Sequence, residues 1–367
     1  MTPVYIDVAS ELRTAIAQIK TELHSKIACT LKNSPDHPQL IRVERTVSPL
    51  AMLDWLALCK SGRKVYWRDR DGTLEATGVG EADTVYGNGI CDADQILNHI
   101  HARLDTCDLP ARYYGGFRFD WDKSIVSRSE EWKAFGGACF VLPLVEVFRR
   151  GEQTILAGQI VINPGFSGNP EELLRPFEAI ADVQESPTVN PQRIFSRTNL
   201  PDRRDWQKRV NRVMSQVEAG VLQKLVLARR VTFRMTGEEN PLTLVSRCHS
   251  GEESATLFAF QMNDGTAFHG APPELLYRRT GRKIYSEAIA GTRPLVPDEK
   301  ESNRLANELF LSAKDRLEVD LVRAGIDEAL APLCRNLTID ERPQIHRAGT
   351  VQHLRYAING LLGETAS

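Results

Sequence analysis

The sequence predicts an α+β fold in which large antiparallel β-sheets are flanked by helices. The first half of the chain alternates short β-branched and aromatic runs with turns rich in Gly and Asp. In the second half, strand-like runs follow one another through the hairpin signals "NDG" at 263–265 and "TGR" at 280–282, and two helical segments come after them. Strands followed by helices, without strict βαβ alternation, favour α+β. A TIM barrel is the alternative.

Composition argues against several classes of partner. The chain has 367 residues, enough for two domains, and its 42% hydrophobic and 26% charged residues are typical of soluble globular proteins. Its net charge of −2 gives no overall attraction to nucleic acid or to an anionic membrane. It shows no signal-peptide or transmembrane pattern, and its seven cysteines are widely spread with no CxxC pair. We therefore expect a cytoplasmic protein with reduced, mostly buried thiols and no nucleic-acid or membrane partner.

The N-terminal half is expected to form an antiparallel sheet. Residues 63–69, "RKVYWRD", alternate with a period of two, and three further β-rich runs follow. These runs are 113–120, 139–151 and 154–163. Two segments rich in Pro, Asn and Ser, at 164–176 and 184–192, predict the connection between the two halves of the chain.

The second half begins with a helix predicted over 201–220, since Pro201 opens it and Gly220 closes it. Apolar residues recur along this helix at helical spacing and predict one buried stripe. They are Trp206, Val210, Val213 and Val217. The run "QKLVLARRVTF" at 223–233 then predicts a strand.

Four more strands and two helices are expected after this strand. The strands are 255–262, 266–271, 274–279 and 283–291. One helix runs from about Asp298 to Leu311, and the next opens at Ser312, whose spacing to Asp315 is that of an N-terminal capping pair. The segment "TVQHLRY" at 350–356 places a histidine inside a β-like run.

Lys224 and Glu274 are the first candidate chemical residues. Lys224 opens the strand that continues as "LVLA", so it is either a surface strand end or a base whose ammonium group is desolvated. Glu274 follows Pro272-Pro273, which restrict the backbone and give its carboxylate a fixed direction. It is either a turn residue that faces solvent or a proton donor held in place.

Asp315 and Glu318 are the candidate metal ligands, because a spacing of three residues puts both carboxylates on one face of a helix. The alternative is a helix N-terminus enriched in acids, which the helix dipole favours. In "SEAIAGTRP", Gly291 and Thr292 offer backbone amides and a hydroxyl that suit a substrate carboxylate. His353 is by default a core histidine with satisfied hydrogen bonds.

Five motifs occur in one order, namely "LQKLVLARR", "FHGAPPELLYRR", "SEAIAGTRP", "SAKDRLEVDLV" and "TVQHLRY". In this order and spacing the chain resembles the chorismate-utilising enzymes, which comprise isochorismate synthases, salicylate synthases, and the large chains of anthranilate and aminodeoxychorismate synthases. It looks most like isochorismate synthases of the menaquinone type. The resemblance implies the fold of anthranilate synthase component I. It is dense from 195 to 357, which implies a weakly matching N-terminal α/β subregion over 1–195 and a chorismate-binding catalytic region over 196–367.

The resemblance implies a catalytic role for two residues. Lys224 matches the general base that activates the water attacking C2 of chorismate. Glu274 matches the general acid that protonates the C4 hydroxyl as it leaves. A lysine that acts as a base near neutral pH needs to be kept from water, so a dry environment is expected for Lys224.

The resemblance also implies a metal and a substrate loop. Glu318 matches a ligand of Mg²⁺ and Asp315 an acid behind it, and the metal binds a substrate carboxylate. Gly291 and Thr292 match the loop at the substrate, chorismate, and His353 matches a histidine that lines the pocket.

The motif "SEAIAGTRP" narrows the implied product. Family members that attack C2 through a lysine side chain carry it directly before the Gly-Thr, where this chain has Ala290. Glu287-Ala288 resembles menaquinone-type isochorismate synthases, whereas anthranilate synthases usually read "PIAGT". Isochorismate, for menaquinone or siderophore synthesis, is the implied product, and salicylate or anthranilate synthesis is the alternative. A Schiff-base lysine in a barrel aldolase is a further alternative for Lys224.

The resemblance implies that the C-terminal part of the catalytic region is absent. The chain ends "AINGLLGETAS" soon after the histidine motif, where the family continues with a Pro-Thr-Pro segment, an arginine-bearing strand, a "GAGI" loop and a final metal-binding Glu. We therefore expect a C-terminally incomplete catalytic region. A shortened homologue that binds chorismate or a partner subunit is the alternative to an active enzyme, and the family includes monomers.

Overall fold

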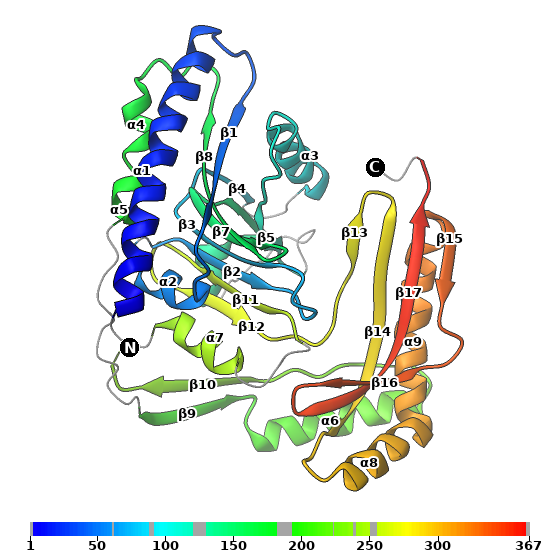
Figure 1. The fold of residues 1–367 in the computed structure, drawn as a ribbon. Helices are drawn as coiled ribbons and strands as arrows, with labels where there is room; N and C mark the ends of the chain where they lie inside the picture. The colour runs from blue at the N-terminus through cyan, green and yellow to red at the C-terminus, as the bar shows by residue number, and fades with distance from the viewer. Residues whose placement is uncertain are drawn as a thin grey trace. The chain divides into compact units, whose positions relative to one another are not determined.

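The computed structural model describes residues 3–60, 62–87, 92–119, 130–181, 193–222, 224–237, 240–249 and 255–364. The chain divides into two compact units, each traced in Figure 1. Unit 1 comprises Met1–Ser186 and Pro241–Pro273, and unit 2 comprises Pro187–Asn240 and Glu274–Ser367. The chain therefore leaves unit 1, returns to it, and leaves it again directly before Glu274.

These units are defined by the contacts within each of them, whereas the predicted boundary between residues 195 and 196 is based on family resemblance. That boundary stays a prediction. The first crossing, after Ser186, falls in the predicted connection at 184–192, which lies outside the described residues. The other proposed connection, 164–176, lies wholly within unit 1.

Unit 1 is built on a seven-stranded sheet in the order β1-β8-β7-β3-β2-β11-β12, with antiparallel neighbours throughout. Its strands are β1 Gln39–Val47, β2 Lys64–Arg68, β3 Glu75–Val79, β7 Val145–Arg150, β8 Gln153–Ile162, β11 Leu257–Gln261 and β12 Ala267–Gly270. A second antiparallel sheet has the order β4-β6-β5. Its strands are β4 Asp83–Gly87, β5 Tyr114–Phe117 and β6 Ala138–Leu142. The β-rich runs of the first half are antiparallel as predicted, but they are divided between two sheets, and the run 139–151 forms β6 in one sheet and β7 in the other.

The long helix α1, Pro3–Lys32, covers β1 and β8 (Figure 1). Its buried side chains recur every three or four residues and form much of the core of unit 1. They are Leu12, Ile16, Ile19, Leu23 and Ile27. The other helices of unit 1 are α2 Met52–Leu58, α3 Ala93–Leu104, the 3₁₀ turn η1 Glu130–Phe135, α4 Pro170–Leu174, α5 Phe177–Ala181 and α7 Pro241–His249.

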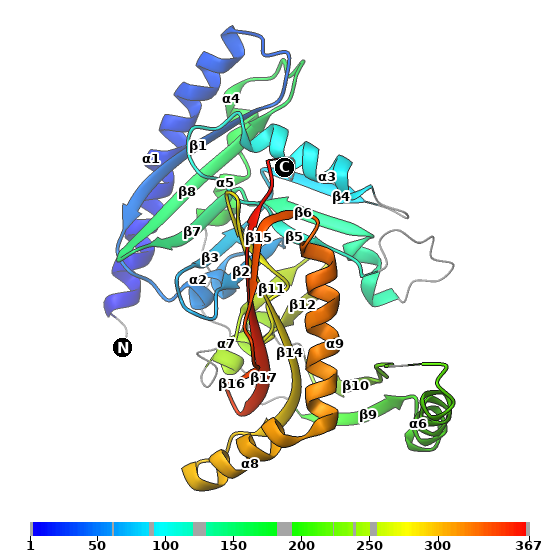
Figure 2. The same cartoon turned by 90° about the vertical axis from the view of Figure 1, so that its right-hand side faces the viewer.

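Unit 2 contains a sheet in the order β13-β14-β17-β15, and β16 also pairs with β17. The strands are β13 Arg278–Thr280, β14 Lys283–Pro294, β15 Cys334–Ile339, β16 Gln344–Ala348 and β17 Val351–Leu362. Helix α9, Ala313–Leu330, lies along β14 and β17 (Figure 2), and α8, Glu299–Leu311, precedes it. Ala288, Leu309, Val319, Leu354 and Tyr356 form the core between the helices and the sheet.

Unit 2 also contains a two-stranded ribbon and helix α6. The ribbon pairs β9, Ile194–Leu200, with β10, Arg230–Met235, and α6 spans Arg203–Glu218 between them. The predicted helix is confirmed, but its predicted buried stripe is wrong. The stripe residues Trp206, Val210 and Val213 are only partly buried and Val217 is exposed, because a two-stranded ribbon offers little apolar surface to a helix.

Two predicted strands are shorter than expected. The run 223–233 is a strand only from Arg230, which pairs with Leu200, the last residue of β9. Residues 224–229 therefore extend beyond the end of the partner strand. The run 274–279 is a strand only from Arg278, which pairs with Tyr285.

The predicted strands 255–262, 266–271 and 283–291 are present as β11, β12 and β14, and both C-terminal helices are present as α8 and α9. The TIM-barrel alternative is wrong, because every strand pair in the described part of the chain is antiparallel and no sheet closes.

No helix among the described residues is long and apolar enough to cross a membrane. The described cysteines are free thiols. Cys59 and Cys139 are buried, but Cys29 is exposed, so the expectation of mostly buried thiols is only partly correct. Cys91 and the side chain of Cys248 lie outside the described residues.

Candidate active site

Lys224 lies beside Glu318. Lys224 belongs to the irregular segment before β10, and its Nζ is 3.4 Å from Oε1 of Glu318 on α9. The two side chains are 31% and 35% exposed. The expected dry environment for Lys224 is therefore wrong, because the segment does not enter a sheet and stays at the surface. An ion pair this exposed adds little to stability.

Gly291 and Thr292 form a β-bulge opposite His353. The pairing of β14 with β17 shifts between Ala290 and Arg293, so two residues of β14 face one residue of β17. Gly291 has a φ of 69°, in the left-handed region that glycine adopts without strain. The sequence-predicted loop therefore exists as a bulge within a continuous strand.

The bulge fixes the orientation of the His353 ring. Its Nδ1 lies 2.9 Å from the carbonyl oxygen of Gly291 and 3.2 Å from Oγ1 of Thr292. Nδ1–H donation to the carbonyl leaves Nε2 as an acceptor. Nε2 is buried and has no hydrogen-bond partner among the described residues. His353 is therefore buried, as the default interpretation expects, but one of its nitrogens remains available to a ligand.

Asp315 lies against the same bulge. The amide of Asp315 donates to Oγ of Ser312 at 3.3 Å, which confirms the predicted cap of α9. Its Oδ2 accepts a hydrogen bond from Nη2 of Arg293 at 3.0 Å. Burial raises the pKa of the Asp315 carboxyl, but the hydrogen bonds with Ser312 and Arg293 outweigh burial and hold that pKa below its usual range.

Sequence reasoning missed Arg293. This guanidinium bonds Asp315 and also donates from Nε to Oε1 of Glu308 at 3.1 Å, so it connects the bulge to both α8 and α9. The signal was its position directly after the Gly-Thr of "SEAIAGTRP".

Glu274 is exposed, and the residues after it are tied to β14. The amide of Leu275 donates to Oε1 of Glu287 at 3.1 Å. Oγ of Ser286 donates to the carbonyl oxygen of Leu276 at 2.7 Å. These two bonds replace the strand ladder that the sequence predicts here, and they anchor the backbone that carries Glu274.

Glu287 is the second residue whose role the sequence did not reveal. Its side chain is fully buried, and besides Leu275 it accepts a hydrogen bond from the hydroxyl of Tyr285 at 3.2 Å. Nη1 of Arg355 lies 3.9 Å from its Oε2. A buried carboxylate needs such partners. No local sequence pattern marks this burial, which Glu287 shares with its strand neighbours Ser286 and Ala288.

The prolines before Glu274 are held within unit 1. The amide of Thr256 donates to the carbonyl oxygen of Pro272 at 3.0 Å, and Nη1 of Arg70 donates to that of Pro273 at 2.9 Å. Glu274 thus follows directly on a segment that is fixed in one unit and precedes a segment fixed in the other.

The structure brings the predicted residues into two groups, each next to one carboxylate of α9. Lys224 meets Glu318, and the bulge with His353 meets Asp315, one helical turn earlier. Glu274 makes no hydrogen bond or ion pair with any of them among the described residues.

The described residues contain no group of three or more His, Cys, Asp or Glu side chains able to hold a metal. They do not form a protein-only cage. Mg²⁺ often takes only one or two carboxylates and completes its shell with water and substrate oxygens. Glu318, partly exposed, fits such a single ligand, whereas Asp315 is committed to Arg293 and fits an acid behind it.

Gly291→Ala is expected to destabilise the protein by about 1–3 kcal/mol, because an L-residue is strained at this φ. The added Cβ would also lie 2.9 Å from Cδ1 of Leu309 and 3.1 Å from Cβ of Asp315. Gly325→Ala is the matched control, since Gly325 lies on α9 with nothing near its Cβ position. The control should stabilise by about 0.5–1 kcal/mol. Urea denaturation measures the free energy of unfolding of both variants. If the two substitutions change it equally, Gly291 is not a position where alanine is strained.

Asp315 is expected to make stability depend on pH. Its pKa is lowered in the folded state. Its contribution is therefore complete above the unfolded pKa of about 3.9 and is lost as the pH falls through the lower folded value. Between about pH 5 and about pH 3, a range that spans this unfolded value, the free energy of unfolding should fall more for wild type than for Asp315→Asn. Denaturation in EDTA-containing buffers measures this difference, and parallel curves would refute it.

The sequence profile of the family described as "Chorismate binding enzyme" matches residues 23–367. Isochorismate synthase, chloroplastic, of Catharanthus roseus is 29% identical over 303 residues, which are 80% of this chain and 51% of the relative. The salicylate biosynthesis isochorismate synthase of Pseudomonas aeruginosa is 32% identical over 262 residues, 70% of this chain and 53% of the relative. The chain spans about half the length of these two relatives.

The fold is also similar to that of an isochorismate synthase. The solved structure of MenF, the menaquinone-specific isochorismate synthase from Escherichia coli, matches with a TM-score of 0.76 at 21% identity, covering 96% of this chain and 76% of that chain. This similarity confirms the predicted α+β fold with large antiparallel sheets. Because the family profile covers nearly the whole chain, from residue 23 to residue 367, the chain belongs to the chorismate-binding enzyme family.

Proposed function

We propose that this chain is an isochorismate synthase, an isomerase that converts chorismate into isochorismate. Water adds at C2 and the C4 hydroxyl leaves as water, so substrate and product have the same composition. The observation that carries the proposal is the position of Lys224, whose Nζ lies 3.4 Å from the carboxylate of Glu318. A base beside the carboxylate that suits a metal is the arrangement this addition requires. The names of the relatives support the same reaction.

Lys224 and Glu274 take the two proton transfers. Lys224, as the neutral amine, removes a proton from the water that attacks C2. Glu274, as the carboxylic acid, gives a proton to the departing C4 hydroxyl. The bonds from Glu287 and Ser286 to the next two residues hold the backbone of this acid.

In the proposed site Glu318 would hold Mg²⁺, with Asp315 behind it. When bound, Mg²⁺ supplies the charge that neutralises a carboxylate of chorismate. Nε2 of His353, buried and without a partner among the described residues, accepts a hydrogen bond from the substrate, and the Gly291-Thr292 bulge presents its backbone to it. We place the protein in the cytoplasm, where its product supplies menaquinone or siderophore synthesis, without a nucleic-acid or membrane partner.

A homologue that binds chorismate without turnover is the second candidate. It is favoured by the exposure of Lys224 and Glu274. Calorimetry with chorismate and Mg²⁺, run beside a product assay, separates the two. Heat of binding with unchanged chorismate would favour the second candidate. Anthranilate or salicylate as the sole product would refute the assignment to isochorismate.

Glu287→Gln is expected to lower kcat about tenfold or more, because displacing a catalytic group by a fraction of an ångström costs that much. Leu275 donates to Oε1 and Tyr285 to Oε2, and glutamine has an amide nitrogen, which cannot accept, in place of one of these oxygens. Tyr285→Phe is the matched control, since it removes only the second of these bonds. A steady-state comparison measures the effect, and a change in KM alone would contradict a role in holding Glu274.

A further inference from the structure

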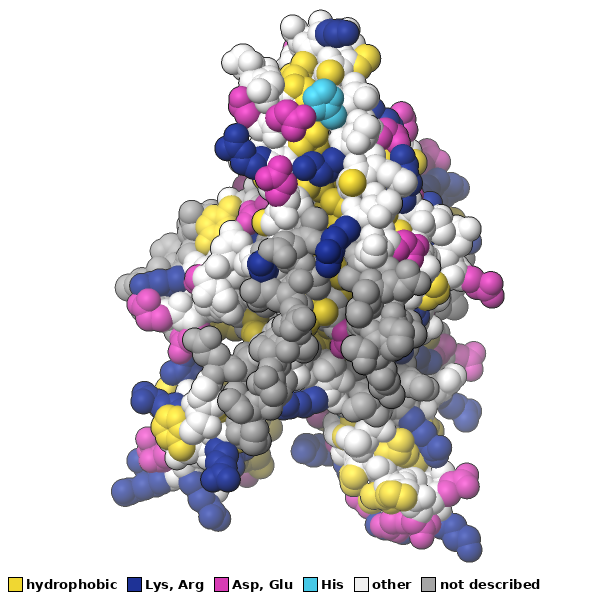
Figure 3. Space-filling model, turned by 60° about the vertical axis from the view of Figure 1, so that its left-hand side comes forward, with side chains coloured by type: hydrophobic (Ala, Val, Ile, Leu, Met, Phe, Trp, Pro, Cys, Tyr) yellow, Lys and Arg dark blue, Asp and Glu magenta, His cyan; other side chains and the backbone are white. Residues whose placement is uncertain are grey.

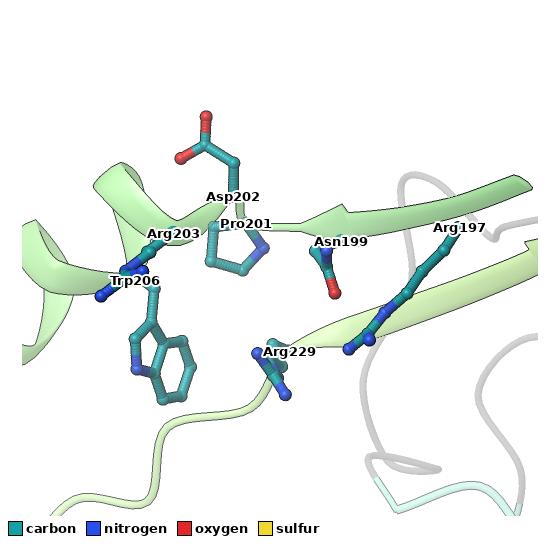
Figure 4. Close-up of a pocket in the computed structure, with 7 residues that line it drawn as sticks. All are labelled: Arg197, Asn199, Pro201, Asp202, Arg203, Trp206 and Arg229. Atoms are coloured by element: carbon teal, nitrogen blue, oxygen red, sulfur yellow. The ribbon is translucent and has the colours of Figure 1, made fainter.

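A cavity of about 390 Å³ opens where β9 runs into α6. It is lined by Arg197, Asn199, Pro201, Asp202, Arg203, Trp206 and Arg229, as Figure 4 shows. None of the residues that the sequence predicts for the chorismate site lines it. Its volume lies within the range of small-molecule sites, about 300–1,000 Å³.

The charge of this arginine pocket is positive and uncompensated. Arg197, Arg203 and Arg229 form no ion pair within the described part of the chain, and Arg197 stacks over Phe233 with 5.7 Å from Cζ to the ring centroid. Asp202 is the one acid in the lining. Its carboxylate accepts the amide of Asp205 at 2.8 Å as the cap of α6, and it points away from the other side chains in Figure 4.

Two other lining groups point to the kind of ligand. Oδ1 of Asn199 is buried and has no hydrogen-bond partner among the described residues, so this acceptor can bind a donor group of a ligand. Trp206 and Pro201 supply a flat apolar wall beside it. Because an unsatisfied buried acceptor costs free energy, a ligand with a hydroxyl or N–H group gains from this position.

The surroundings strengthen the positive field. Residues 193–237 contain eleven Lys and Arg but three Asp and Glu, although the whole chain has a net charge of −2. In Figure 3, Lys and Arg side chains gather at the lower left, where α6 lies. Such a field raises the local concentration of anions.

We propose that the arginine pocket binds a small organic dianion with a flat ring. The guanidinium forks of Arg197 and Arg229 hold its carboxylate or phosphate group, the ring packs on Trp206, and a hydroxyl donates to Asn199. The proposal is independent of chorismate turnover, because none of the catalytic candidates lines the pocket.

Calorimetry with 4-hydroxyphenyl phosphate and with 5-hydroxyisophthalate tests the pocket and separates phosphate from carboxylate ligands. We expect saturable binding of at least one probe at millimolar concentration or below, about −4 kcal/mol or better. Arg197→Gln and Arg229→Gln should each weaken it about tenfold, the loss expected for one charge-assisted hydrogen bond. Arg212→Gln, on α6 but outside the pocket, is the matched control and should leave binding unchanged.

Two further variants guard against misfolding. Arg197→Lys keeps the charge but loses the fork, so binding should fall while the circular dichroism spectrum is retained. Asn199→Asp places a negative charge beside the ligand and should abolish binding. The proposal is overturned if neither probe saturates, or if Arg212→Gln weakens binding as much as Arg197→Gln, since diffuse charge would then explain it.

Discussion

Lys224→Ala is expected to lower the rate of isochorismate formation by about 10²- to 10⁴-fold, the contribution of a positioned general base. The amine is the group that removes a proton from the attacking water. It lies 3.4 Å from Glu318, so alanine removes both the base and the charge next to the proposed metal ligand. The rate of product formation at saturating chorismate and Mg²⁺ measures the loss.

Lys224→Arg separates these two effects. Arginine keeps a positive charge near Glu318 but stays protonated at any working pH, so it cannot accept a proton. We expect this variant to be as slow as Lys224→Ala. Activity close to that of wild type in Lys224→Arg would show that Lys224 serves only as a cation.

Glu274→Gln is expected to lower kcat by about 10²- to 10⁴-fold with little change in KM, because glutamine keeps the shape of the side chain but has no proton to give. The backbone anchors at Leu275 and Leu276 do not involve this side chain, so the fold should be unaffected. Steady-state kinetics with chorismate provide both constants.

Glu328→Gln on α9 is the matched control for Glu274→Gln, since it neutralises an exposed acid of the same unit. It should leave kcat within about twofold of wild type, as expected for a surface change. If Glu274→Gln behaves like this control, the leaving hydroxyl takes its proton from another donor.

Elements with strong local signals were predictable from the sequence. The Ser312 cap, the glycine that closes α6 and the hairpin before β14 depend on a few neighbouring residues, and the structure contains each of them. The helical spacing of apolar residues in α1, every three or four positions, was equally readable, yet that helix was not predicted. Its buried leucines and isoleucines show the pattern clearly.

Features that depend on distant partners were not predictable. Lys224 was expected to open a strand, but β9 ends at Leu200, so the ladder with β10 starts only at Arg230. The burial of Glu287 depends on a loop that folds back onto β14, which no local pattern encodes. The stripe on α6 has the period of a buried helix face, but burial also requires a neighbour that covers it.

Part of the candidate site could be predicted from the sequence, and part of it depends on tertiary packing. The resemblance implied a substrate loop at Gly291-Thr292 and a pocket histidine at His353, and the structure shows His353 within hydrogen-bond distance of both loop residues. The sequence did not reveal Arg293 as the link between the bulge and Asp315, because pairing between a strand and a helix depends on tertiary packing.

Mass spectrometry after incubation of the chain with chorismate and Mg²⁺ in ¹⁸O-labelled water tests the proposed function most directly. Because Lys224 activates a water molecule to attack C2, we predict isochorismate that carries one ¹⁸O atom in its C2 hydroxyl, formed about 10²- to 10⁴-fold more slowly by Lys224→Ala. Unchanged chorismate, or isochorismate without the label, would contradict the proposed reaction.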